Sequence, residues 1–182
     1  MSLFDKVVAA VTPLESQEKR MEARAEARAR ARPGGWLSQV IDHHEQIEGA
    51  FALVKEENDA PARRAAQKAL GVLLTGHANA EETVLYPALV AHSQKGHAGL
   101  AYEEQAATKV EMALLEQLDP MSQDYIDKLE HIEGAVTHHM YQEESGWFLE
   151  LKDAVPADEQ AQMSARYREE IDRYAGAELT AA

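Results

Sequence analysis

The sequence predicts an all-α protein whose centre is an up-and-down antiparallel four-helix bundle. Hydrophobic residues make up 45% of the 182 residues but aromatic residues only 6%, and this alanine-rich composition favours packed helices over sheets. Four segments carry apolar residues at helical spacing; they cover about residues 36–57, 61–92, 97–118 and 122–153. The connections between them are short, which makes consecutive helices antiparallel neighbours.

Further helices are expected on both sides of the bundle. We divide the chain into an N-terminal helical arm at residues 1–35, the bundle at 36–153, and a C-terminal docking helix and tail at 154–182. The arm has an apolar segment at residues 3–11 and then nearly alternating Ala, Arg and Glu up to Arg32. This second part has little apolar face, so we interpret it as a solvated helix, with an arm that binds a partner as the alternative.

The C-terminal helix carries one apolar stripe. Met163, Tyr167, Ile171 and Tyr174 follow one another at spacings of four and three residues, which puts them on one face. We expect this face to pack on the outside of the bundle or on a second subunit. A protein partner or a homodimer that uses the terminal helices is an assembly that the sequence allows.

Charge and composition exclude several classes of function. Acidic residues outnumber basic residues 32 to 18, and the resulting net charge of -14 repels nucleic-acid phosphates and anionic lipid headgroups. The absence of cysteine excludes disulfides, thiolate metal sites and cysteine nucleophiles. No segment has the roughly 18 apolar residues of a membrane span, and the N-terminus lacks the basic start of a signal peptide. We therefore expect a cytoplasmic protein that binds neither nucleic acid nor membranes.

A histidine and two glutamates recur with the same spacing in the second and fourth bundle segments. The pattern HxxxEExxx, followed by an aromatic residue, begins at His77 and again at His139. Residues four apart share one face of a helix, so each unit directs an imidazole and a carboxylate, Glu81 or Glu143, toward a common point. Two such helices that face each other would form a pocket with four ligands.

The apolar neighbours indicate which histidines point inward. Large apolar residues flank His77 and His139 on their helix faces, whereas His138 shares its strip with small and polar residues. By the same test His44, rather than His43, lies on the apolar face of the first bundle helix. Three imidazoles and two carboxylates buried without a strong cationic partner need compensation, which a metal ion provides for all five.

Three nearby features are expected to stay outside this site. Glu48 lies four residues after His44, but we interpret it as a solvated glutamate, as we do Glu82. Tyr86-Pro87 is expected to close the second helix beneath the site.

Three stretches together resemble the hemerythrin HHE cation-binding family: IDHHEQIEGAF around His44, HANAEETVLYP from His77, and HHMYQEESGWF, which contains His139. The resemblance covers about residues 36–152 and implies a hemerythrin-like bundle that holds a non-heme centre of two iron ions with an oxo or hydroxo bridge. Zinc and manganese also suit such ligands. The ligands implied are His44, His77, Glu81, His139 and Glu143, with both glutamates bridging the ions.

The third bundle helix departs from the family pattern. Family members have a histidine in this helix, and the alignment places Gln105 at that position. A neutral amide binds iron far less strongly than imidazole does. One ion therefore lacks a ligand, is absent, or gains a ligand or an outer hydrogen-bond partner from Glu104, Tyr102 or His97.

These observations lead us to expect a metal-binding protein that binds, stores or senses dioxygen, nitric oxide, peroxide or iron itself. We assign no catalytic residue and expect a binding protein rather than an enzyme. One alternative is a di-iron oxidase or peroxide-removing enzyme, which needs an open metal position and a nearby proton donor. The other is an interaction protein in which the metal is structural.

Overall fold

The computed structural model describes residues 15–92 and 95–178, so the apolar segment expected at residues 3–11 lies outside the described residues. Within these ranges there is no strand, and none of the helices is long and apolar enough to cross a membrane. The helices are α2 (Gln17–Arg30), α3 (Trp36–Glu56), α4 (Ala60–Ala80), η1 (Glu81–Leu85), α5 (Tyr86–Ala91), α6 (Lys95–Leu115), α7 (Gln123–Gln142), η2 (Glu143–Trp147), α8 (Phe148–Ala154) and α9 (Ala157–Glu178).

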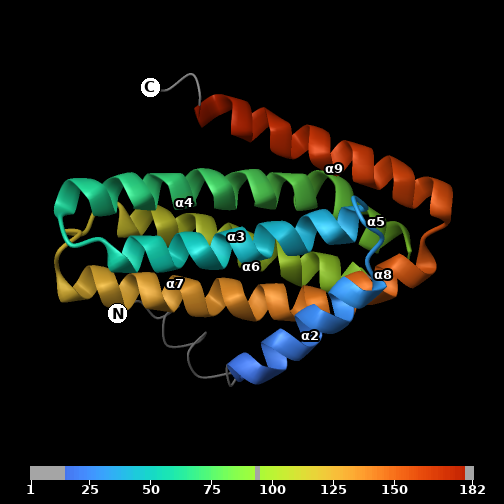
Figure 1. Ribbon diagram of the computed structural model, residues 1–182, viewed down its shortest axis with the longest axis horizontal. Coiled ribbons are helices and arrows are strands. Elements are labelled where there is room, and N and C mark those ends of the chain that lie inside the picture. The colour runs from blue at the N-terminus through green and yellow to red at the C-terminus, as the bar shows by residue number, and fades with distance from the viewer. Residues whose placement is uncertain (1–14, 93–94, 179–182) are drawn as a thin grey trace.

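The expected four-helix bundle is confirmed. Its helices are α3, α4 continued by η1 and α5, α6, and α7 continued by η2 and α8, and they run up and down as antiparallel neighbours (Figure 1). Side-chain caps define where two of them begin: Asp59 accepts a hydrogen bond from the backbone N–H of Ala62, and Ser122 accepts one from that of Tyr125.

The second and fourth bundle helices each widen into a π-helical turn, η1 and η2, that begins at a glutamate of the repeat. In η1 the backbone N–H of Tyr86 donates to the carbonyl of Glu81, and in η2 that of Phe148 donates to the carbonyl of Glu143. The expectation that Tyr86-Pro87 closes the second helix is wrong, because the chain continues as α5 to Ala91. Single π-turns inside α-helices often occur at functional sites.

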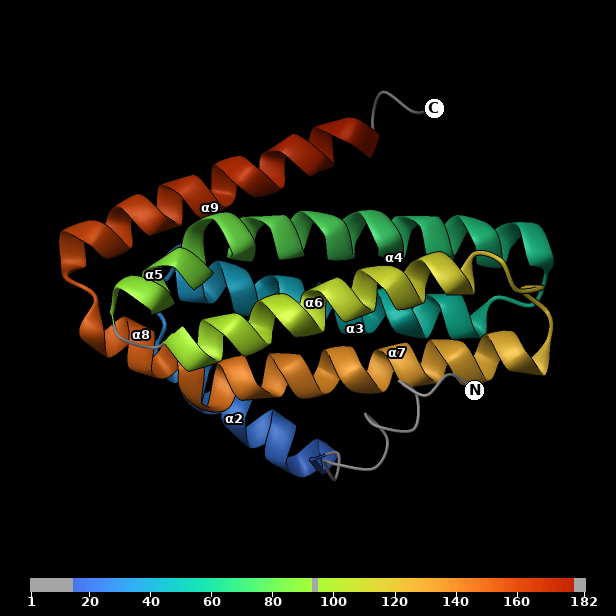
Figure 2. The same ribbon diagram turned by 180° about the vertical axis from the view of Figure 1, so that it is seen from behind.

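Helix α9 packs on the bundle beside α4, as the views from both sides show (Figure 2). Met163 and Tyr167 are buried in the same apolar cluster as Trp36, and Ile171 packs against it. The hydroxyl of Ser164 accepts the backbone N–H of Trp36 at 2.9 Å. The stripe of the C-terminal helix therefore packs on the bundle, which was one of its two expected positions.

Helix α2 is largely exposed, as its alternating sequence suggested, but one face of it packs on the bundle. Its Ala27 is fully buried, and its arginines bind carboxylates of α3. Arg24 contacts Glu48 at 2.6 Å, and Arg28 contacts Asp42 at 2.5 Å. Glu48 is thus paired with the arm rather than solvated alone, because the arm lies against this face of α3.

Two clusters of buried apolar side chains fill the bundle and leave a polar layer between them. On α3, Ile41 belongs to one cluster and Ile47 to the other, and His44 lies between them in the chain. The same order holds on α4, where Leu70 and Ala80 belong to different clusters and enclose His77. The fold therefore surrounds the inward histidines with apolar packing on both sides.

Two glycines inside α4 provide a matched test of how closely α9 packs. A Cβ added at Gly76 would lie 3.0 Å from the Cβ of Tyr174, whereas one added at Gly71 would meet only the Cε of Met112, at 3.8 Å. Glycine in a helix interior costs about 0.5–1 kcal/mol relative to alanine. We expect Gly71→Ala to raise the free energy of unfolding by about this amount, and Gly76→Ala to gain less or to lose stability. Equal gains in denaturant titrations of the two variants would contradict the close packing.

Candidate metal centre

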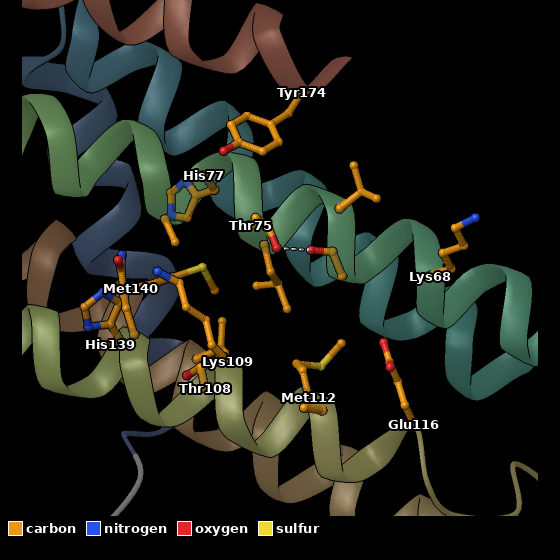
Figure 3. A pocket seen from close by; sticks show the side chains of 17 residues that line it. Lys68, Thr75, His77, Thr108, Lys109, Met112, Glu116, His139, Met140 and Tyr174 are labelled. Carbon is orange, nitrogen blue, oxygen red and sulfur yellow. Dashed lines mark hydrogen bonds between the residues drawn. The ribbon is translucent and has the colours of Figure 1, made fainter. Parts of the chain in front are cut away.

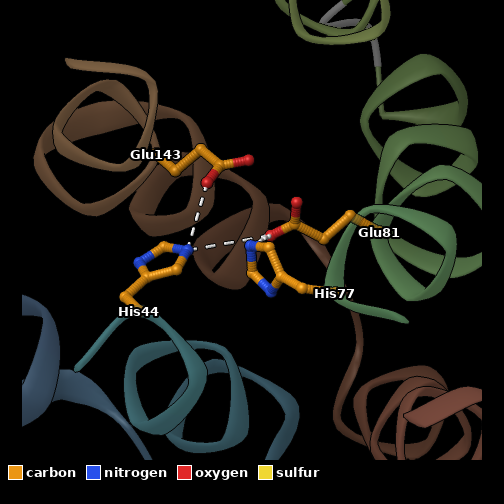
Figure 4. Close-up of side chains that lie close together, drawn as sticks. All are labelled: His44, His77, Glu81 and Glu143. Carbon is orange, nitrogen blue, oxygen red and sulfur yellow. Dashed lines mark ion pairs between the residues drawn. The ribbon is translucent and has the colours of Figure 1, made fainter. Parts of the chain in front are cut away.

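Four side chains from α3, α4, η1 and η2 meet in the polar layer. One ligand atom from each of His44, His77, Glu81 and Glu143 lies within 4.8 Å of the others, and the side chains point toward one another in Figure 4. The closest pairs are His44 Nε2 with Glu143 Oε2 and His77 Nε2 with Glu81 Oε1, both at 3.3 Å. We call these residues the four-residue cluster. Three of them have no solvent exposure, and His77 has 4%.

The four ligand atoms that face the middle of this cluster have no hydrogen-bond partners. Within the described part of the chain, His44 Nε2, His77 Nε2, Glu81 Oε1 and Glu143 Oε2 are all buried and unpartnered. Leaving a buried polar atom unpaired costs about 1–3 kcal/mol, and more for a charged group. A metal cation would bind all four atoms, so these residues fit a metal ion.

A second group of donors adjoins the first. His139 Nε2 lies 3.3 Å from Glu143 Oε1, and the Tyr86 hydroxyl lies 3.1 Å from His139 Nε2, Glu81 Oε2 and Glu143 Oε1. Each glutamate thus directs one oxygen into the four-residue cluster and the other toward His139 and Tyr86. That is the arrangement of a carboxylate able to bridge two ions.

The other ring nitrogen of each inward histidine is held by a different element. His44 Nδ1 contacts Glu144 at 2.8 Å, His77 Nδ1 contacts Tyr167 at 3.2 Å, and His139 Nδ1 contacts Glu104 at 2.7 Å. Such outer partners set the ring orientation and the tautomer of metal-binding histidines. They leave all three Nε2 atoms directed at the centre.

The N-terminal arm takes part in this arrangement. Glu144 is only 1% exposed, and Arg24 Nε of α2 donates to it at 2.9 Å. Burial lowers the pKa of Arg24, but the hydrogen bond to Glu48 and the charges of Glu144 and Glu48 raise it more. Arg24 therefore stays charged and links the arm to His44 through Glu144.

Gln105, which the resemblance was expected to place at a histidine position, lies beside the second group of donors. Its side chain is 6% exposed, and its Nε2 donates to Glu81 Oε2 at 2.6 Å and to the Tyr86 hydroxyl at 2.5 Å. The amide thus presents its N–H groups, rather than a metal-binding atom, to the site.

The other candidates of the third bundle helix have different contacts. The Tyr102 hydroxyl donates to the backbone carbonyl of Glu82 at 2.7 Å. The ring of His97 stacks on Trp147, with 5.4 Å between ring centroids. Glu104 differs from Tyr102 and His97 because its carboxylate contacts Nδ1 of the inward histidine His139.

The neighbours expected to face solvent are all paired. His138, the neighbour of His139 in the chain, is half-buried and contacts Glu15 at 2.8 Å. Glu82 forms an ion pair with Lys109 at 2.6 Å. Both residues stay outside the four-residue cluster, as expected, but they are partly covered by Glu15, which precedes α2, and by Lys109 of α6.

Burial and neighbouring charges shift the pKa values in opposite directions. Burial lowers the pKa of His139, but the charge of Glu143 and the hydrogen bond to Glu104 raise it more, to about 10. Burial and the charge of Glu143 raise the pKa of Glu81 to about 7, while burial and His44 hold the pKa of His77 well below its usual value. At neutral pH the metal-free site therefore holds a proton on His139 that a bound metal must displace.

Three residues of the centre were missed by reasoning from the sequence: Tyr86, Glu144 and Tyr167. Tyr86 enters through the π-turn, which changes the 3.6-residue period on which helical faces are predicted. The repeat did contain Glu144, but nothing in the pattern separates it from Glu82. Tyr167 was recognised only as part of an apolar stripe.

The fold and the donor atoms define a helical bundle with a buried histidine and carboxylate site suited to a cation. The chain belongs to the hemerythrin HHE cation binding domain family, whose profile matches residues 37–151. It is also similar to a protein of Nostoc sp. (strain PCC 7120) named "DNA nickase", with 25% identity over 128 residues, which cover 69% of this chain and 36% of that protein. The chain thus spans about a third of the length of this relative. No solved structure matches it.

The two halves of the repeat allow a controlled test of the outer partners. Glu144 and Glu82 occupy equivalent positions, but only Glu144 contacts a histidine of the site. We expect Glu144→Ala to weaken metal binding about 10- to 100-fold, the usual cost of losing such a partner. Glu82→Ala should leave metal affinity nearly unchanged. Equal effects of the two substitutions in metal titrations would show that the Glu144 contact does not orient His44.

The raised pKa of His139 predicts that the thermal stability of the metal-free protein and its affinity for metal change in opposite directions with pH. The pKa of His139 is about 10 in the folded chain against an ordinary 6.5, so its contribution to stability is full below 6.5 and is lost as pH rises through about 10. We expect the Tm of metal-free protein to fall between about pH 7 and pH 10. Metal affinity should rise over the same range, because the metal binds neutral imidazole. A metal-free Tm that is flat or rising in thermal melts would contradict this assignment.

Proposed function

We propose that the chain is a non-heme iron protein of hemerythrin type that holds two iron ions and reversibly binds dioxygen, nitric oxide or peroxide as a sensor or store. The observation that carries this proposal is the set of four buried, unpartnered ligand atoms of the four-residue cluster. Membership of a cation-binding family supports it.

Each residue has a role in this proposal. His44 and His77, with the inner oxygens of Glu81 and Glu143, would hold the first ion, and His139 with the outer oxygens would contribute to the second. Bound iron supplies an open coordination position for a small ligand. The apolar clusters on either side keep the four residues of the cluster almost fully buried, with exposures of 0–4%.

The donor types suit iron, zinc and manganese alike, and the two carboxylates directed at both groups of donors support iron among them. Imidazole suits zinc, copper and iron, whereas carboxylate suits manganese and other hard ions. The four-residue cluster has two imidazole and two carboxylate donors, and both carboxylates also face the second group of donors. Such a mixed set of donors suits both ferrous and ferric iron. Zinc and manganese remain the metals to compare in titrations.

A cleft between α4 and α6 favours a second candidate, an oxidase that acts on an organic molecule. The cleft has a volume of about 450 Å³, and His77 and His139 line one end of it (Figure 3). Met112 lines its middle, and Lys68 and Glu116 line the far end. It offers more room than a diatomic ligand needs.

We do not extend the name of the Nostoc relative to a DNA-directed activity of this chain. Arg24, Arg28 and Arg30 of the arm form ion pairs with carboxylates of the same chain. The net charge of -14 opposes phosphate binding. Binding of a nucleic acid at physiological salt would contradict this view.

Metal analysis of purified full-length chain tests the proposal. We expect iron to bind stoichiometrically and His77→Ala to lose most of it, because this substitution removes one of four inward donors. His138→Ala is the control, since it removes a neighbouring half-buried histidine that contacts Glu15. Full iron content in His77→Ala would refute the assigned site.

The same iron-loaded protein separates the candidate functions. A reversible spectral change with oxygen, nitric oxide or peroxide, without consumption of the ligand, supports a sensor or store. Multiple turnovers of oxygen or peroxide support the oxidase. A metal-free chain with unchanged stability and no spectral response on metal addition would contradict both.

A further inference from the structure

Tyr86 lies in the middle of the second group of donors. Its side chain is fully buried, and its hydroxyl is 3.1 Å from each of Glu81 Oε2, His139 Nε2 and Glu143 Oε1. A phenol has a single proton and can donate it to only one of these three atoms at a time. His139 Nε2 can donate to the phenol oxygen, but the contact with the second carboxylate then joins two oxygens with no proton between them. A cation shared by these donors would compensate that contact.

The spacing of these four atoms agrees with a shared ion. Donors about 2.0–2.2 Å from a tetrahedral metal lie about 3.3–3.6 Å from one another. Four of the six separations in this group are 3.1, 3.1, 3.1 and 3.3 Å. Only small movements of these side chains are needed to accommodate an ion.

The π-turn explains how Tyr86 reaches this position. In a regular α-helix a residue five places after Glu81 would be rotated by about 140° and would point away from the site. In η1 the N–H of Tyr86 bonds to the carbonyl of Glu81, which brings the two residues onto the same face. In η2 the equivalent residue is Phe148, which has no hydroxyl and packs edge-on against Trp36. The chain therefore offers a phenol at one of two equivalent positions.

From these contacts we infer that Tyr86 is a phenolate ligand of a second metal ion, together with His139 and the outer oxygens of Glu81 and Glu143. It supplies the ligand that the third bundle helix lacks at Gln105, and the Gln105 amide orients it by donating to its oxygen at 2.5 Å. The bond between oxygen and metal forms as the O–H bond breaks, and the proton passes to solvent. No electron is transferred in this step. The inference rests on the proposed iron centre.

Visible spectroscopy of the iron-loaded full-length chain tests the inference. Phenolate bound to ferric iron gives a charge-transfer band in the visible range and characteristic resonance Raman vibrations of the ring. We expect both in the air-oxidised wild-type protein. We expect Tyr86→Phe to lose them and to bind about one iron fewer per chain.

Tyr102→Phe is the matched control. The Tyr102 ring packs against Tyr86 with 5.1 Å between centroids, but its hydroxyl donates to a backbone carbonyl. This variant should keep the band, the vibrations and the iron content of the wild type. If Tyr86→Phe does not fold, the resonance Raman spectrum of the wild-type chain still tests whether a phenolate is bound to iron.

The failures of the two proposals give different results. Two irons without phenolate vibrations, or an unchanged spectrum in Tyr86→Phe, would overturn the role of Tyr86 and leave the iron centre standing. One iron in the wild-type chain without phenolate vibrations would overturn the second ion. A wild-type chain that binds no iron would refute the proposed function itself.

Discussion

The structure depends on one constraint, the burial of two carboxylates and three imidazoles in the core of a helical bundle. Such groups are stable in a core only when each polar atom has a partner. The outer nitrogens of the histidines have theirs in Glu144, Tyr167 and Glu104, from η2, α9 and α6. The inner atoms face one another, which explains why the four-residue cluster combines complete burial with unpaired donors.

The internal repeat gives two similar sequences opposite roles in this site. After the first HxxxE unit, Glu82 pairs with Lys109 near the surface, and the aromatic Tyr86 enters the centre. After the second unit, Glu144 is buried against His44, and the aromatic Phe148 joins the apolar core. The difference arises from the neighbours, since α6 covers one half of the repeat and the arm α2 covers the other. Equal patterns therefore predict equal backbone geometry, here a π-turn in each half, but not equal contacts.

Features that depend on residues close together in the sequence could largely be predicted, and features that depend on residues far apart in the sequence could not. Helical periodicity and short connections predicted the bundle, because these signals depend on local spacing, and the apolar strip around His44 selected it over His43. The structure brings His44, His77, Glu81 and Glu143 together and places His139 beside them. Tyr86 could not be predicted on a 3.6-residue period because the π-turn shifts its face. Arg24 and Tyr167 could not be predicted because each contacts the site from a helix far away in the chain.

The contact of Arg24 with Glu144 connects the N-terminal arm to the metal centre, because Glu144 in turn contacts His44. Its alternating Ala, Arg and Glu suggested a solvated helix, yet Arg24 is 18% exposed in its side chain and bonds to a glutamate that is nearly inaccessible. Detachment of α2 would remove Arg24 from Glu144 and leave His44 as the remaining partner of this glutamate. Coupling between two binding events is reciprocal, so whatever the docked arm contributes to metal affinity, the bound metal contributes equally to the docking of the arm.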